Sequence, residues 1–120
     1  MSRLRRDSSY LADILEASER VAAYTEGLTY EDFLARPMVQ DAVLRNIQVI
    51  GEATKKLSSG LRTGHAHIPW QAMAGMRDRI VHHYFGINYE VVWDVVRKDL
   101  PRVASQVRAV LAEVARGEGE

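Results

Sequence analysis

The stretch MRDRIVHHYF, residues 76–85, places two arginines, two histidines, an aspartate and a tyrosine within ten consecutive positions. On a helix that turns by about 100° per residue, Arg77 lies in the middle of an apolar stripe. The other members of the stripe are Trp70, Met73, Ala74, Ile80, Val81 and Tyr84. Because burying an unpaired cation is costly, this pattern predicts that Arg77 has a partner or faces a wet cleft.

The same helix, predicted to begin at Pro69 and end at Gly86, carries a second feature. Asp78 and His82 are four residues apart, the spacing at which a carboxylate can orient an imidazole. His82, however, lies about 140° around an ideal helix from Arg77, so the two side chains do not converge. Either the helix distorts near His82, or a second copy of the chain completes the site across a two-fold axis.

Length and composition set the broad class. The 120 residues, 47% hydrophobic and 27% charged, predict one domain over residues 1–120 that is neither disordered nor membrane-bound. No apolar run reaches the roughly 18 residues of a membrane span, and the N-terminus does not resemble a signal peptide. The absence of cysteine excludes disulfides and thiolate metal sites. We therefore expect a cytoplasmic protein.

The charges predict how RNA could bind. Sixteen basic residues balance sixteen acidic ones, so there is no overall basic field to attract nucleic acid. Binding would have to come from a local cleft. A symmetric homodimer would supply one, because it doubles Arg77, Arg79, His82 and His83 in one groove.

The rest of the chain is predicted to be helical. Apolar periodicity favours helices over residues 4–26, 30–35, 37–58, 89–98 and from about 99 onwards, with a loop over 58–68 and a frayed tail over 116–120. Thr29 and Asp32 are spaced as a capping box, and Asp99 is a candidate cap of the last helix. The predicted fold class is all-α, an antiparallel bundle of four to five helices.

Two further polar features have modest interpretations. Asn46 borders the apolar faces of the 37–58 helix and is interpreted as a satisfied interior amide. His65 and His67 could contact a metal, but zinc sites need three or four protein ligands, so no metal site is predicted.

The residues alone already suggest a reaction. Arg77, His82 and Tyr84 are of the types needed to cleave a phosphodiester without a metal. A histidine can exchange a proton with a 2′-hydroxyl or a leaving oxygen, and an arginine can stabilise charge on phosphoryl oxygens. The alternative is purely structural: Arg77 pairs with Glu52 or another acid, and the two histidines merely end a helix.

The central stretch also resembles a known family. Residues 77–84 match the pattern of arginine, four residues, histidine, any residue and tyrosine in the HepT-like ribonuclease toxins of the HEPN superfamily. The likeness extends over residues 45–53, 68–70, 73–76, 85–87, 92–94 and 99–101, and covers roughly residues 4–111. It implies a HEPN-like helical bundle that forms a homodimer.

The resemblance implies specific roles. Arg77 and His82 would be catalytic in a metal-independent endoribonuclease that needs no cofactor and has its site at the dimer cleft. Asp78 and His83 would have supporting roles. Tyr84 would be AMPylated by a cognate nucleotidyltransferase antitoxin of the MntA type, as in a type VII-like toxin–antitoxin system. The added bulk and negative charge would exclude an RNA phosphate.

Two other functions remain open from the sequence. The chain could be a non-catalytic helical dimer that binds nucleotide and serves as docking partner and substrate of a nucleotidyltransferase. It could also be a purely structural dimer, in which case Tyr84→Phe should change no activity and no partner.

Overall fold

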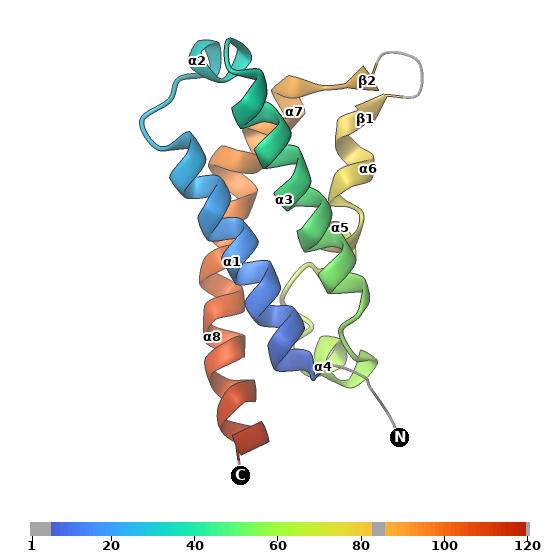
Figure 1. Cartoon of the computed structure of the whole chain (residues 1–120). Coiled ribbons are helices and arrows are strands. Elements are labelled where there is room, and N and C mark those ends of the chain that lie inside the picture. The colour runs from blue at the N-terminus through green and yellow to red at the C-terminus, as the bar shows by residue number, and fades with distance from the viewer. Residues whose placement is uncertain (1–5, 83–85, 120) are drawn as a thin grey trace.

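The computed structural model describes residues 6–82 and 86–119 and is dominated by three long helices (Figure 1). These are α1 (Asp7–Thr25), α3 (Pro37–Lys55) and α8 (Leu100–Gly119). α1 packs against both α3 and α8 and runs antiparallel to them. The prediction of an all-α fold is confirmed.

Shorter elements complete the bundle. In chain order they are α2 (Tyr30–Leu34), α4 (Ser59–Gly64), α5 (Trp70–Ala74), α6 (Met76–Ile80), the strands β1 (Val81–His82) and β2 (Gly86–Ile87), α7 (Tyr89–Asp94) and the π-helical turn η1 (Val95–Asp99). α5 and α6 lie beside α3, and the strand pair continues from α6 at one end of the bundle (Figure 1). Within the part of the chain that is described, no helix combines the length and apolar character that a membrane crossing requires.

The core forms where the apolar faces of the three long helices meet. α3 is central, because it also contacts α2, α5 and α6, as its two neighbouring apolar faces predict. The fully buried side chains include Leu11, Ile14, Val21, Phe33, Val43, Ile47, Ile50, Val92, Val95 and Val107. Asn46 is buried beside them and donates from Nδ2 to the Ala42 carbonyl at 2.8 Å, which confirms its interpretation as a satisfied amide.

Three predicted boundaries are wrong. The 58–68 segment contains α4, because Ser58 caps a helical turn by accepting from the Leu61 N–H at 3.2 Å. Asp99 does not cap α8; the chain passes from η1 into α8 without a break. Pro101 has no N–H to donate to a carbonyl of the preceding turn. The Leu100 N–H donates to the Val95 carbonyl, five residues back, which is the hydrogen bond of a π-helix. α8 also continues to Gly119, through most of the predicted frayed tail. A glycine in a helix costs only about 1 kcal/mol, so Gly117 does not end it.

The predicted capping box is confirmed at the start of α2. The Asp32 N–H donates to the Thr29 hydroxyl oxygen at 3.1 Å, and the Thr29 N–H donates to the Asp32 carboxylate at 3.0 Å. Two otherwise unpaired donors are thereby satisfied, which fixes the start of a five-residue helix.

Thr29→Ala should lower the free energy of unfolding by about 1 kcal/mol, because it removes the capping oxygen.

Hydrogen bonding from Thr29 holds the pKa of Asp32 below its ordinary value. A carboxylate of this kind stabilises the fold above its unfolded pKa and loses that effect as the pH falls through its folded pKa. Asp32→Asn should therefore be less stable than wild type at pH 7, with a gap that narrows below about pH 4. Urea denaturation at both pH values measures this, and a gap that widens in acid would contradict it.

Candidate functional site

The candidate site begins where the predicted helix of residues 69–86 breaks. α5 ends at Ala74, Gly75 interrupts the chain, α6 spans only five residues, and Val81 is extended at φ −100° and ψ 123°. The prediction of one continuous helix is therefore wrong. β-branched residues at 80 and 81 favour extended backbone, and Gly86 adopts a left-handed φ of +78° that allows the chain to return in β2.

The strand pair is tied to both flanking helices. Val81 pairs with Ile87 and His82 with Gly86 in antiparallel register. The Asn88 N–H then donates to the Ile80 carbonyl at 2.7 Å, while the Asn88 side chain caps α7 by accepting from Val91. The end of α6 and the start of α7 are therefore held together.

α7 is anchored in turn by aromatic packing. The Phe33 ring lies 5.1 Å from the Trp93 ring and 6.1 Å from the Tyr89 ring, centroid to centroid. Phe33 is fully buried, so α2 fixes the position of α7 and, through it, the return strand β2.

Arg77 lies in an open groove between α3 and α6. The groove has a volume of about 320 Å³ and is lined by Asp41, Leu44, Arg45, Gln48, Arg77, Ile80, Val81 and Ile87. We call it the Arg77 groove. Trp70, Met73 and Ile80 are buried, as the apolar stripe predicts, but Arg77 is exposed. The break at Gly75 removes Arg77 from the apolar stripe. Of the two predicted environments, a partner or a solvent-exposed cleft, the structure shows the second.

The structural alternative for Arg77 finds no support in the described part of the chain. Among residues 6–82 and 86–119, Arg77 has no ion pair and no side-chain hydrogen bond. Glu52, the proposed partner, lies 3.8 Å from Lys55 Nζ instead.

The helical pairing of Asp78 with His82 is wrong, because α6 ends at Ile80 and the two residues do not share a helix. Asp78 is exposed in the first turn of α6. The backbone of His82 is in β1, next to Val81, which lines the Arg77 groove. The His82 side chain, and all of His83 and Tyr84, lie outside the described residues.

Arg79 is held away from the groove by an ion pair. Its Nη1 donates to the Asp99 carboxylate at 2.9 Å, which connects α6 to η1. The place of Arg79 in a basic groove between two copies stays a prediction, while within one chain Arg79 bridges α6 and η1.

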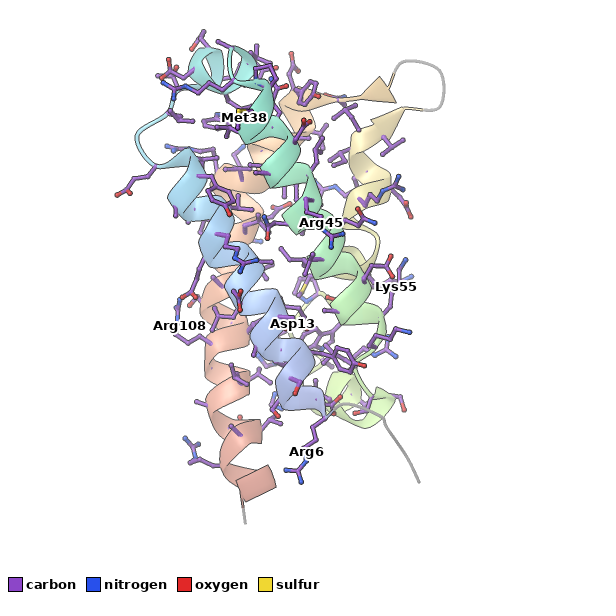
Figure 2. All side chains as sticks on the ribbon, in the orientation of Figure 1. Arg6, Asp13, Met38, Arg45, Lys55 and Arg108 are labelled. Atoms are coloured by element: carbon purple, nitrogen blue, oxygen red, sulfur yellow. The ribbon has the colours of Figure 1, made fainter. Side chains whose placement is uncertain are left out.

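Arg45 and Gln48 were not predicted as site residues. Both are exposed on α3 and line the groove together with Arg77 (Figure 2 labels Arg45). In the sequence they appear only on the polar face of an amphipathic helix. Only the packing of α6 against α3 reveals which part of that face lies opposite Arg77.

The separation of α3 from the α5–α6 segment depends on Gly51. A Cβ at this position would lie 3.2 Å from the Ala74 carbonyl oxygen, a backbone atom that cannot rotate away. Gly51→Val should therefore lower the free energy of unfolding by about 1–3 kcal/mol, as overpacking does. Gly60→Val is the matched control, because a Cβ at Gly60 has no atom within 4 Å. Equal urea midpoints for the two variants would contradict the close approach.

Metal-binding groups do not assemble in residues 6–82 and 86–119. No group of three or more histidine, aspartate or glutamate side chains there could hold an ion. The rings of His65 and His67 are 6.2 Å apart, and the His65 carbonyl accepts from Trp70 Nε1 at 3.0 Å.

Known proteins match most of the chain. The family model described as Ribonuclease HepT-like matches residues 14–110. A Thermococcus cleftensis protein named "Probable ribonuclease HepT" is 42% identical over 97 residues, covering 81% of this chain and 88% of that protein. "Putative RNase TTE0752" from Caldanaerobacter subterraneus subsp. tengcongensis is 38% identical, covering 85% of this chain and 91% of its own.

An archaeal relative extends the coverage. "Putative RNase MJ0127" from Methanocaldococcus jannaschii is 38% identical over 112 residues, covering 93% of this chain and 92% of that protein. No solved structure gives a significant match. The match of one family model to residues 14–110, with relatives of similar length, confirms the resemblance seen in residues 77–84. The chain belongs to the HepT-like ribonuclease family.

Proposed function

We propose that this protein is a cytoplasmic, metal-independent endoribonuclease that works as a homodimer and cleaves RNA at the cleft between the two copies. Family membership supports the ribonuclease activity. The observation that carries the site is the exposed, unpaired Arg77 in a groove whose wall includes Val81, immediately before His82.

The proposed reaction is an internal transfer of the phosphodiester. A histidine removes the proton from a ribose 2′-hydroxyl, and the 2′-oxygen attacks the adjacent phosphorus. The bond to the 5′-oxygen breaks, and this leaving oxygen takes a proton from an acid. The products are a 2′,3′-cyclic phosphate and a free 5′-hydroxyl. Arg77 stabilises the negative charge that builds up on the non-bridging oxygens.

Counting the proton-transfer groups supports the homodimer. One step requires a base and an acid at the same time, and none of the described residues that line the Arg77 groove is a histidine. His82 of one subunit and the partner subunit's His82 would supply both. A two-fold axis beside the hairpin would also double the unpaired arginine charge in a chain whose formal net charge is zero.

We further propose that Tyr84 is the control point. A nucleotidyltransferase antitoxin of the MntA type would transfer AMP from ATP to the Tyr84 hydroxyl and release pyrophosphate. Tyr84 follows His82 by two residues, so the added phosphate would lie beside the cleft and repel RNA. Asp78 and His83 have supporting roles in this scheme.

The test combines RNA cleavage with a mass measurement. The purified protein is first analysed by intact mass to establish that Tyr84 is unmodified, and is then incubated with RNA in EDTA. Cleavage in EDTA, lost after treatment with the antitoxin and ATP but retained in treated Tyr84→Phe, would support both proposals. Modification of Tyr84 without any cleavage by the unmodified protein would instead favour a non-catalytic docking partner.

Activity should depend on pH with a bell-shaped profile. If one His82 acts as base and the other as acid, the rate falls when both are protonated and again when both are neutral. Initial rates between pH 5 and 9 at constant ionic strength measure this. A flat profile would argue against a histidine pair.

A further inference from the structure

We infer that Arg45, one wall of the Arg77 groove, binds the RNA phosphate next to the one that is cleaved. This inference rests on the proposed function, because it takes RNA as the occupant. It assigns to α3 a substrate-binding role separate from the chemistry at Arg77 and His82.

The first support is the state of the Arg45 side chain. Arg45 is exposed and, within the described residues, forms no ion pair or hydrogen bond. Asp41, one turn earlier on α3, lines the same groove but forms no ion pair with Arg45 in the described part of the chain. Some other exposed arginines are engaged, such as Arg79, which pairs with Asp99, and Arg108, which pairs with Glu19. Arg45 is thus free to bind an anion.

The second support is placement. Arg45 and Arg77 come from different helices, α3 and α6, and line one groove of about 320 Å³. A guanidinium presents a planar set of donors that fits a phosphate bidentately. Two such groups in one groove can hold two successive phosphates of a single strand.

A neighbouring groove limits the number of phosphate contacts that we expect. Arg45 and Gln48 also line a neighbouring groove of about 310 Å³ between α1 and α3, together with Tyr10, Asp13, Val49, Glu52, Ala53 and Lys56. This second groove carries both Asp13 and Glu52, so its charge is mixed. The phosphate track therefore ends at Arg45, and we expect one additional phosphate contact rather than several.

The experiment measures binding without cleavage. A fluorescent 2′-O-methyl RNA of about ten nucleotides, which lacks the attacking hydroxyl, is titrated at several salt concentrations in EDTA. Each phosphate contact to a single strand contributes about 0.7 to the slope of log K against log salt. Arg45→Ala should reduce the slope by about 0.7 and weaken binding about tenfold.

Two variants separate binding from structure. Arg45→Lys keeps the charge and should restore the salt slope, although it binds more weakly because the bidentate contact is lost. Arg116→Ala removes an equal exposed charge near the end of α8, which forms neither groove, and should bind as wild type does. Unchanged thermal midpoints would show that all the variants are folded.

Substrate length gives an independent arm. A dinucleoside monophosphate has a single phosphate. Arg45→Ala should therefore bind it with the same affinity as wild type, whereas Arg77→Ala should bind it less well. Weakened dinucleotide binding in Arg45→Ala would overturn the assignment to a second phosphate and favour a site for a free nucleotide.

The outcomes separate this inference from the proposed function. If wild type cleaves RNA and Arg45→Ala retains the full salt slope, the inference alone fails. If wild type binds RNA without cleaving it and the slope falls in Arg45→Ala, the ribonuclease proposal fails and the subsite stands. If wild type does not bind RNA, both fail.

Discussion

Arg77→Ala is expected to lower kcat for RNA cleavage by about 10²- to 10³-fold, the loss typical of removing one group that stabilises a developing anion. Arg77 is exposed and has no partner among the described residues, so its removal leaves no buried charge and should not affect folding. The loss should appear in kcat, because the charge on the phosphoryl oxygens is greatest in the transition state.

Arg79→Ala is the matched control, two residues away on the same short helix. It breaks the pair with Asp99, whose side chains are 48% and 31% exposed, and such pairs contribute about 0–1 kcal/mol. Its cleavage rate should remain within a few-fold of wild type. His82→Ala should lose about 10²- to 10⁴-fold, as expected for a general acid or base. Full activity in Arg77→Ala, or equal losses in Arg77→Ala and Arg79→Ala, would remove Arg77 from the mechanism.

Phe33→Ala is expected to lower the free energy of unfolding by about 3–5 kcal/mol. The ring is fully buried and lies against Trp93 and Tyr89, so its removal leaves a cavity between α2 and α7. Because folded proteins are stable by only about 5–15 kcal/mol, a loss of this size should be visible in urea denaturation at 25 °C.

Leu34→Ala provides the comparison, because Leu34 is the next residue on α2 and is 44% exposed. It should cost much less than Phe33→Ala. If the two variants unfold at the same urea concentration, the aromatic cluster does not anchor α7.

The helices that follow from periodicity are the ones that the sequence predicts well. α1 and α3 have long apolar faces. Local rules also explain the capping box at Thr29, which begins α2, and Pro37 in the first turn of α3. The failures lie where a long-range contact overrides local preference. α4 is a case in point: the backbone and hydroxyl of its cap, Ser58, both donate to Asp7, 51 residues away.

The central stretch of the candidate site can be recognised in the sequence, but its geometry cannot. The pattern of residues 77–84 identifies the family, which the comparisons confirm, while the roles of Arg77 and His82 stay predictions. An ideal helix set His82 about 140° from Arg77 and left two solutions open. The described residues favour the distortion, since α6 ends at Ile80 and the chain becomes extended before His82. A second subunit remains part of the proposed function.

The sequence does not identify Arg45 as a site residue, for a different reason. A helical pattern identifies an exposed face but not the neighbour that this face meets, and α6 lies about 30 residues further along the chain. Only tertiary packing makes the residue distinctive.

The missing side chain at Gly51 also bears on the two arginines of the Arg77 groove. Gly51 follows Arg45 on α3, and its contact, the Ala74 carbonyl, comes three residues before Arg77. We therefore expect the size of residue 51 to influence the distance between Arg45 and Arg77. A graded series at this position, from glycine through alanine to serine, would adjust the gap in small steps. The affinity for single-stranded RNA should change along this series if both arginines hold phosphates.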